Sequence, residues 1–112
     1  MIPIPKSLLI HSCTLETPLG EDGYGKVSYS DPVTLEHVRI DPSSSLSSDK
    51  QNRELRLSAV LIYDCRNSSG LNGNIEFQEE QRITFEGAQY TVNKISRLYG
   101  RLRLHHYEVE LI

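Results

Sequence analysis

Apolar and polar positions alternate through residues 82–112, as they do in β-strands that bury one face. Two breaks divide this segment, one at Gly87-Ala88 and one at Tyr99-Gly100. Each break leaves two residues for a turn, which is the commonest length of a β-hairpin connection. The pattern therefore predicts a C-terminal meander of three antiparallel strands, the last of which runs to the final residue.

The two turns also predict which residues face each other. Glycine at the first central position, Gly87, favours a type II′ turn, whose twist matches the flanking strands. This register places the apolar residues of the first hairpin opposite apolar partners. In the first hairpin, the expected pairs are Phe85 with Tyr90 and Ile83 with Val92. In the second hairpin, they are Leu98 with Arg101, Ile95 with Leu104, Val92 with Tyr107 and Tyr90 with Val109.

The apolar face of the second hairpin changes side near Lys94 and His105. Both strands switch at the same level, so the register needs no bulge. Either the ribbon turns a barrel corner and is buried on each face in turn, or its tip presents an apolar face to another molecule. The arginines of the tip favour the second interpretation, because Arg is enriched at protein interfaces. The candidate interface residues are Ile95, Arg97, Arg101, Leu102, Arg103 and Leu104.

The rest of the chain also shows strand patterns and no convincing helical period. Strands are expected at residues 8–15, 26–30, 33–40 and 55–64, with loops at 16–25 and 66–74. The apolar phase shifts between Leu35 and Val38, which predicts a bulge. Residues 55–64 are apolar on both faces, as in a central strand. The fold class is all-β, a small antiparallel barrel or sandwich of about six to seven strands.

Residues 41–53 break the strand pattern, because they are serine-rich, polar and without apolar periodicity. They are expected to form one long flexible loop. A short helix over 48–55, capped by Ser47 or Ser48, is an alternative. Long loops in small domains often carry function, so this one is a candidate to order against a partner or inside a channel. Its candidate contact residues are Ser43, Ser44, Ser45, Asp49 and Lys50.

Length and charge limit the classes of function. The 112 residues suffice for one domain, 1–112, with residues 1–7 as an extended arm favoured by prolines. The net charge of −3 and pI of about 5.8 do not suggest a basic surface that binds nucleic acid. No apolar run approaches the length of a membrane span, so we expect no membrane partner.

Candidate chemistry is sparse. The two cysteines, Cys13 and Cys65, are expected to be reduced, buried thiols. Together with His11 and the pair His105-His106 they could ligate zinc, but they lack the closely spaced cysteines of structural zinc sites. Glu79-Glu80 is expected to be a solvated turn. We expect no metal or cofactor and no catalysis, since no nucleophile, base and orienting group can be proposed.

Four segments carry a resemblance to a known family: residues 83–92 (ITFEGAQYTV), 105–111 (HHYEVEL), 4–9 (IPKSLL) and 60–64 (VLIYD). With them, the chain resembles over essentially its full length the minor capsid proteins of tailed-phage and prophage morphogenesis clusters in Gram-positive bacteria. Those proteins are similar to the small β-barrel head-closure proteins, also called stoppers or head–tail connectors, of long-tailed phages.

The resemblance implies a structural protein of the phage neck, with no catalytic residues. It implies a homo-oligomeric ring beneath the portal and its adaptor that holds in the packaged DNA and receives the tail. The chain is then a monomer in isolation, made and assembled in the bacterial host cytoplasm. The last strand could offer an edge for pairing. A second hypothesis is a small barrel that binds single-stranded nucleic acid or a small ligand.

Overall fold

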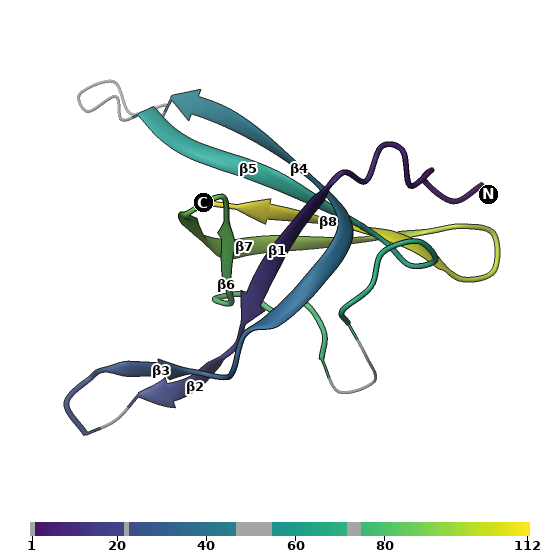
Figure 1. Ribbon diagram of the computed structural model, residues 1–112. Helices are drawn as coiled ribbons and strands as arrows, with labels where there is room; N and C mark the ends of the chain where they lie inside the picture. The colour runs from purple at the N-terminus through teal and green to yellow at the C-terminus, as the bar shows by residue number, and fades with distance from the viewer. Residues whose placement is uncertain (1, 22, 47–54, 72–74) are drawn as a thin grey trace.

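The computed structural model describes residues 2–21, 23–46, 55–71 and 75–112 (Figure 1). The described residues form strands and no helix, which confirms the predicted all-β class; in particular they include no helix long and apolar enough to cross a membrane. The strands are β1 (His11–Glu16), β2 (Pro18–Glu21), β3 (Val27–Tyr29), β4 (Val33–Leu46), β5 (Leu55–Asp64), β6 (Arg82–Phe85), β7 (Ala88–Tyr99) and β8 (Leu104–Leu111).

Six of these strands close into an antiparallel barrel in the order β1-β4-β5-β8-β7-β6, with β6 pairing back onto β1. The barrel rather than the sandwich is therefore the architecture. β2 and β3 form a separate two-stranded sheet that projects from it (Figure 1). The C-terminal strand β8 pairs with both β5 and β7, so the predicted free edge at the end of the chain is wrong.

Alternate residues of the barrel strands fill the core, which includes Leu15, Leu35, Val38, Ile40, Leu61, Ile83, Val92, Val109 and Leu111. The predicted bulge in β4 is confirmed, because His11 pairs with Val38 but Cys13 pairs with Leu35. The extra residue on β4 turns Leu35 and Val38 to the same side, and both are fully buried. His37, inside the bulge, has a φ of 55°.

The first turn of the meander differs from the prediction. Its central residues are Glu86 and Gly87, with φ values of 50° and 81°, as in a type I′ turn. Phe85 consequently pairs with Ala88, and Ile83 pairs with Tyr90. The predicted pairs were wrong because Gly87 fits the second central position of a type I′ turn as well as the first of a type II′ turn.

The second hairpin also differs. Ile95 pairs with Val109, and the connection is a longer loop in which the Gly100 N–H donates to the Arg103 carbonyl at 2.8 Å. Asn93 on β7 and His105 on β8 are extra residues where the register shifts. These bulges keep the apolar residues on one side of the ribbon. The predicted change of face without a bulge was therefore wrong.

Several predicted boundaries also need correction. β5 has the bounds expected for it, but β1 starts at His11, and the expected loop at residues 16–25 contains β2. Residues 41–46 of the expected loop at 41–53 continue β4 and pair with β5. The rest of that loop, residues 47–53, and most of the alternative helix lie outside the described residues.

Residues 75–81 close one end of the barrel, a role that the sequence pattern did not reveal. Phe77 is buried and packs edge-on against Tyr63 and Tyr107, with ring centroids 5.8 and 5.2 Å away. Buried Gln81 ties the same segment down, since its Oε1 accepts from the Gln78 N–H at 2.7 Å. Its Nε2 donates to the Glu76 carbonyl at 2.8 Å and to the Thr17 hydroxyl at 3.2 Å.

The turn after β5 is fastened to the β4 bulge. Ser69 and Glu36 exchange two backbone hydrogen bonds of 2.9 and 3.0 Å. Gly70 follows with a φ of 122°, and a Cβ atom there would lie 2.4 Å from the Thr34 carbonyl oxygen. Only glycine permits this approach, and the approach fixes the position of the turn after β5.

We predict that Gln81→Leu destabilises the protein by about 2–4 kcal/mol, because the Gln78 N–H and the Glu76 carbonyl lose their buried partner. Chemical denaturation followed by tyrosine fluorescence would measure the change in the free energy of unfolding. Gln89→Leu on the exposed side of β7 is the matched control and should change it by less than about 0.5 kcal/mol. Equal effects at the two sites would contradict the role of Gln81.

Candidate interaction surface

The β7–β8 hairpin extends past the end of its neighbour β5. The last pair between β5 and β8 joins Asp64 to His106, so the residues between Leu98 and His105 project beyond that strand (Figure 1). The loop at their end exposes Leu102 almost fully, at 93%, and Tyr99 to 65%. Ile2 of the N-terminal arm is 85% exposed. We call residues 98–105 the tip.

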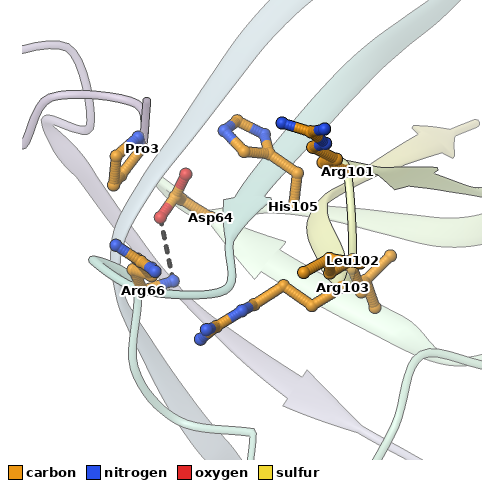
Figure 2. A pocket seen from close by; sticks show the side chains of 9 residues that line it. Pro3, Asp64, Arg66, Arg101, Leu102, Arg103 and His105 are labelled. Atoms are coloured by element: carbon orange, nitrogen blue, oxygen red, sulfur yellow. Dashed lines mark hydrogen bonds between the residues drawn. The ribbon is translucent and has the colours of Figure 1, made fainter. Parts of the chain in front are cut away.

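A hollow of about 170 Å³ lies between the tip, the N-terminal arm and the turn after β5 (Figure 2). Its apolar lining comes from Pro3, Leu102 and Leu104. Three exposed arginines surround it: Arg66 from the turn, and Arg101 and Arg103 from the tip. The hollow therefore combines an apolar floor with a cationic rim.

The N-terminal arm forms one wall of the hollow because Asp64 holds it. The Asp64 Oδ2 atom accepts from the Ile4 N–H at 2.9 Å, and its Oδ1 accepts from the N–H groups of Arg66 and Asn67, each at 2.9 Å. The Asn67 side chain donates back to the Ile4 carbonyl at 2.7 Å. Burial alone would raise the pKa of Asp64, but the backbone donors and nearby His105 outweigh it, so the pKa is lowered.

One histidine, His105, fastens the arm from the other side, and His106 contacts it in turn. The Ile2 carbonyl lies 2.7 Å from His105 Nε2 and can only accept, so this nitrogen carries a proton. His105 Nδ1 lies 2.7 Å from His106 Nδ1, and His106 Nε2 lies 3.4 Å from a Glu108 carboxylate oxygen. This chain of contacts connects the start of the protein to β8.

The Asp64 carboxylate also lines the hollow, but its oxygens accept from backbone N–H groups rather than from guanidinium groups. Within the described part of the chain, Arg66, Arg101 and Arg103 form no ion pair, whereas Arg39 and Arg82 pair with Asp41 and Glu16. Uncompensated guanidinium groups beside apolar surface are typical of protein-binding sites, where Arg and aromatic residues dominate the binding energy.

The structure separates the six predicted interface residues into two groups. Arg101, Leu102 and Arg103 lie exposed at the tip, around the hollow. Ile95 and Leu104 pack against the barrel core, and the Arg97 guanidinium lies 5.9 Å from the centre of the Tyr107 ring. The sequence prediction did not include Tyr99 in the interface, although its place in the predicted turn Tyr99-Gly100 was a usable signal. No local signal could have brought Ile2 or Arg66 to the same surface.

The predicted channel residues lie elsewhere. Ser43, Ser44 and Ser45 pair with Ser58, Leu57 and Arg56 where β4 and β5 continue beyond the barrel as a two-stranded ribbon (Figure 1). Asp49 and Lys50 lie outside the described residues.

The residues considered as zinc ligands have other surroundings. His11 Nδ1 accepts from the Ile40 N–H at 3.0 Å. Cys13 is buried, and burial raises the pKa of its thiol to about 12. Cys65 is exposed, which corrects the expectation of two buried thiols. The described residues contain no group of three or more His, Cys, Asp or Glu side chains that could hold a metal ion.

We predict that Asp64→Asn costs about 1–3 kcal/mol at pH 7, since an amide cannot accept from all three backbone donors. Because the pKa of Asp64 is lowered in the folded protein, its carboxylate stabilises the fold fully at pH values above the ordinary aspartate pKa. This stabilisation is lost as the pH falls through the folded-state pKa. The difference in the free energy of unfolding between the parent protein and Asp64→Asn should therefore shrink below about pH 4. Chemical denaturation at a series of pH values would measure it. Asp41→Asn, at an exposed ion pair, is the control; a difference independent of pH would contradict the role of the Asp64 charge.

Comparison with known proteins gives a family match and similarity to solved structures. The solved structure of the phage-like element PBSX protein xkdH from Bacillus subtilis is 18% identical, with a TM-score of 0.47 over 93% of each chain. No curated protein matches the chain. The model of the minor capsid protein family matches residues 5–111. Because this match covers nearly the whole chain, the protein belongs to the minor capsid protein family of phages and prophages and is a structural component of the virion.

Proposed function

We propose that this minor capsid protein acts at the phage neck as a head–tail connector. In this proposal, copies assemble as a ring beneath the portal and its adaptor, close the DNA-filled head and join the tail. The protein then works by binding other virion proteins, without catalysis. The observation that carries the proposal is the tip, which exposes Leu102 and Tyr99 beside three unpaired arginines within the described structure.

Such a surface is unfavourable to leave in water. Clusters of exposed apolar side chains on small soluble proteins mark interaction sites. Tyr and Arg are the side chains that most often dominate binding energy at protein interfaces. We propose that the tip, with Arg101, Leu102 and Arg103, contacts a neighbouring protein of the neck.

The β4–β5 ribbon has a second proposed role. Its described end, Ser43 to Ser45 opposite Arg56 to Ser58, extends away from the barrel (Figure 1). In a ring, this ribbon would line the central channel and lie near the packaged DNA. A serine-rich sequence suits that position, because DNA can pass along it without the clustered cations that grip phosphates.

The alternative function, binding of single-stranded nucleic acid or a small ligand, has less support. Stacking platforms for bases need exposed aromatic side chains in a basic groove. Here Tyr63, Phe85 and Tyr107 belong to the buried core, and the exposed Tyr24 and Tyr99 lie on different hairpins. A titration with labelled single-stranded oligonucleotides at low salt should be flat; salt-dependent binding would favour this alternative.

We predict that Leu102→Asp prevents head–tail joining while leaving the fold intact, because Leu102 is 93% exposed. The measurement is complementation of a phage that lacks this protein, with tailed particles counted by electron microscopy. We expect a loss of roughly tenfold or more, as for a hot-spot residue. Thermal denaturation of the purified variant should match the parent protein.

Ile10→Asp is the matched control, since Ile10 is another exposed apolar residue, at 64%, outside the tip. It should support normal numbers of tailed particles. Normal joining by Leu102→Asp would remove the tip from the proposal. A protein missing from the neck of wild-type particles would overturn the connector function itself.

A further inference from the structure

We propose that the β2–β3 hairpin of one copy docks into the hollow beside the tip of the next copy. The inference rests on the proposed ring and names the contact that builds it. The occupant of the hollow is thus a second copy of this chain, and the contact is head-to-tail.

The β2–β3 hairpin exposes apolar surface that binding to another molecule would bury. It stands outside the barrel as a sheet of only two strands, which is marginal in water without further packing. It exposes Leu19 to 66%, Val27 to 38% and Tyr24 to 97%. Three large apolar side chains on so small an element indicate a binding surface.

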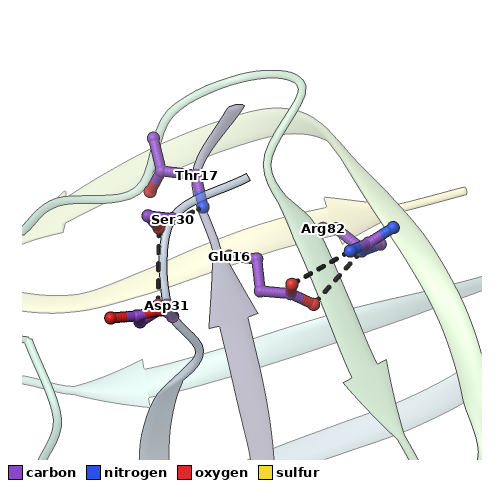
Figure 3. Close-up of polar contacts among 5 residues, drawn as sticks. All are labelled: Glu16, Thr17, Ser30, Asp31 and Arg82. Atoms are coloured by element: carbon purple, nitrogen blue, oxygen red, sulfur yellow. Dashed lines mark hydrogen bonds and ion pairs between the residues drawn. The ribbon is translucent and has the colours of Figure 1, made fainter. Parts of the chain in front are cut away.

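The base of this hairpin is held firmly, so the hairpin is presented in a fixed direction. The Ser30 N–H donates to the Thr17 carbonyl at 2.8 Å, and the Thr17 N–H donates to the Ser30 hydroxyl at 3.0 Å (Figure 3). Arg82 binds both carboxylate oxygens of Glu16, at 3.1 and 2.9 Å (Figure 3). Its guanidinium also lies 4.0 Å from the centre of the Tyr29 ring.

The charges of the two elements are complementary. Residues 18–31 carry Glu21, Asp22 and Asp31 against Lys26, which gives three negative charges, one positive charge and a net charge of −2. The hollow carries three arginines, Arg66, Arg101 and Arg103, against one carboxylate, Asp64, so its lining is net positive. An acidic element that approaches this rim is attracted, whereas two tips or two hairpins repel each other.

The sizes are also complementary. A dry cavity of about 150 Å³ holds a benzene ring, and the hollow measures about 170 Å³. It therefore has room for one aromatic side chain, and Tyr24 is the most exposed aromatic residue of the hairpin. The guanidinium groups of the rim would lie against the face of that ring as cation–π partners.

The placement of the two elements decides the kind of assembly. The β2–β3 hairpin and the tip lie at opposite ends of the molecule (Figure 1), so one chain cannot fill its own hollow. A contact between different surfaces on successive copies is heterologous, and its repetition gives a closed ring or an open filament. This contact is the type that a connector ring requires.

Photo-crosslinking in phage particles tests the inference. Tyr24 is replaced by benzoylphenylalanine, which keeps an aromatic ring, and purified particles carrying the variant are irradiated. We expect a ladder of crosslinked oligomers of this chain, with residues 99–105 of one copy joined to position 24 of another. The same replacement at Ile10, exposed but outside both elements, should give no ladder.

Charge reversal adds a matched pair of variants. Arg101→Glu with Arg103→Glu should lower the crosslinking yield roughly tenfold, and Glu21→Arg in the same chain should restore most of it. Crosslinks from position 24 to another protein, or none in particles that retain this chain, would overturn the inference and leave the connector function standing. If microscopy finds no copy of the chain in the neck, the proposed function fails instead.

Discussion

The closure between β1 and β6 is the constraint on which the rest of the structure depends. β6 has only four residues, and the seam consists of three pairs: Thr14 with Thr84, Leu15 with Ile83, and Glu16 with Arg82. Without it the barrel would be an open sheet with two edges, which invites pairing with other chains. The seam is therefore reinforced from its ends, by the Glu16–Arg82 ion pair and by the hydrogen bonds of buried Gln81 to Thr17 and Glu76. The Arg82 guanidinium of this pair also lies 4.0 Å from the centre of the Tyr29 ring, so the seam contacts the β2–β3 hairpin at its base.

A closed barrel restricts how such a protein can bind others. Since β8 pairs on both sides and β6 closes onto β1, the six-stranded barrel itself offers no strand edge for addition of a partner strand. Three elements project beyond the barrel and are available for contacts: the β2–β3 hairpin, the β4–β5 ribbon and the tip of β7–β8 (Figure 1). These are two-stranded elements joined to a rigid base, which suits the proposed contacts with several neighbours in fixed directions.

Features that depend on residues close together in the chain could be predicted from local patterns in the sequence. Alternation predicted the strands, and the phase shift between Leu35 and Val38 predicted the β4 bulge, because a bulge is the local way to place both residues in one core. The same reasoning failed at Asn93 and His105, where paired shifts on two strands imitated a change of face.

The hollow could not be predicted at all. It depends on contacts such as Ile4 with Asp64, sixty residues apart, and Ile2 with His105, which leave no periodic signal. Phe77 was missed for a related reason, since the two alternating apolar residues Ile75 and Phe77 are too short a pattern to predict a buried segment.

The corrected register also changes the energetics of the tip. With Ile95 and Leu104 packed against the core, the exposed apolar surface shrinks to Leu102 and Tyr99, with guanidinium groups around them. Such a contact is small, and small interfaces between folded proteins are weak and transient in solution. A weak pairwise contact is an advantage for a protein expected to stay monomeric until it reaches its place in the virion. Once a ring of partners presents many sites together, each further contact is effectively intramolecular, and weak contacts sum to a stable assembly. The sparse surface of the tip is thus compatible with the proposed ring, if that ring forms only on the particle.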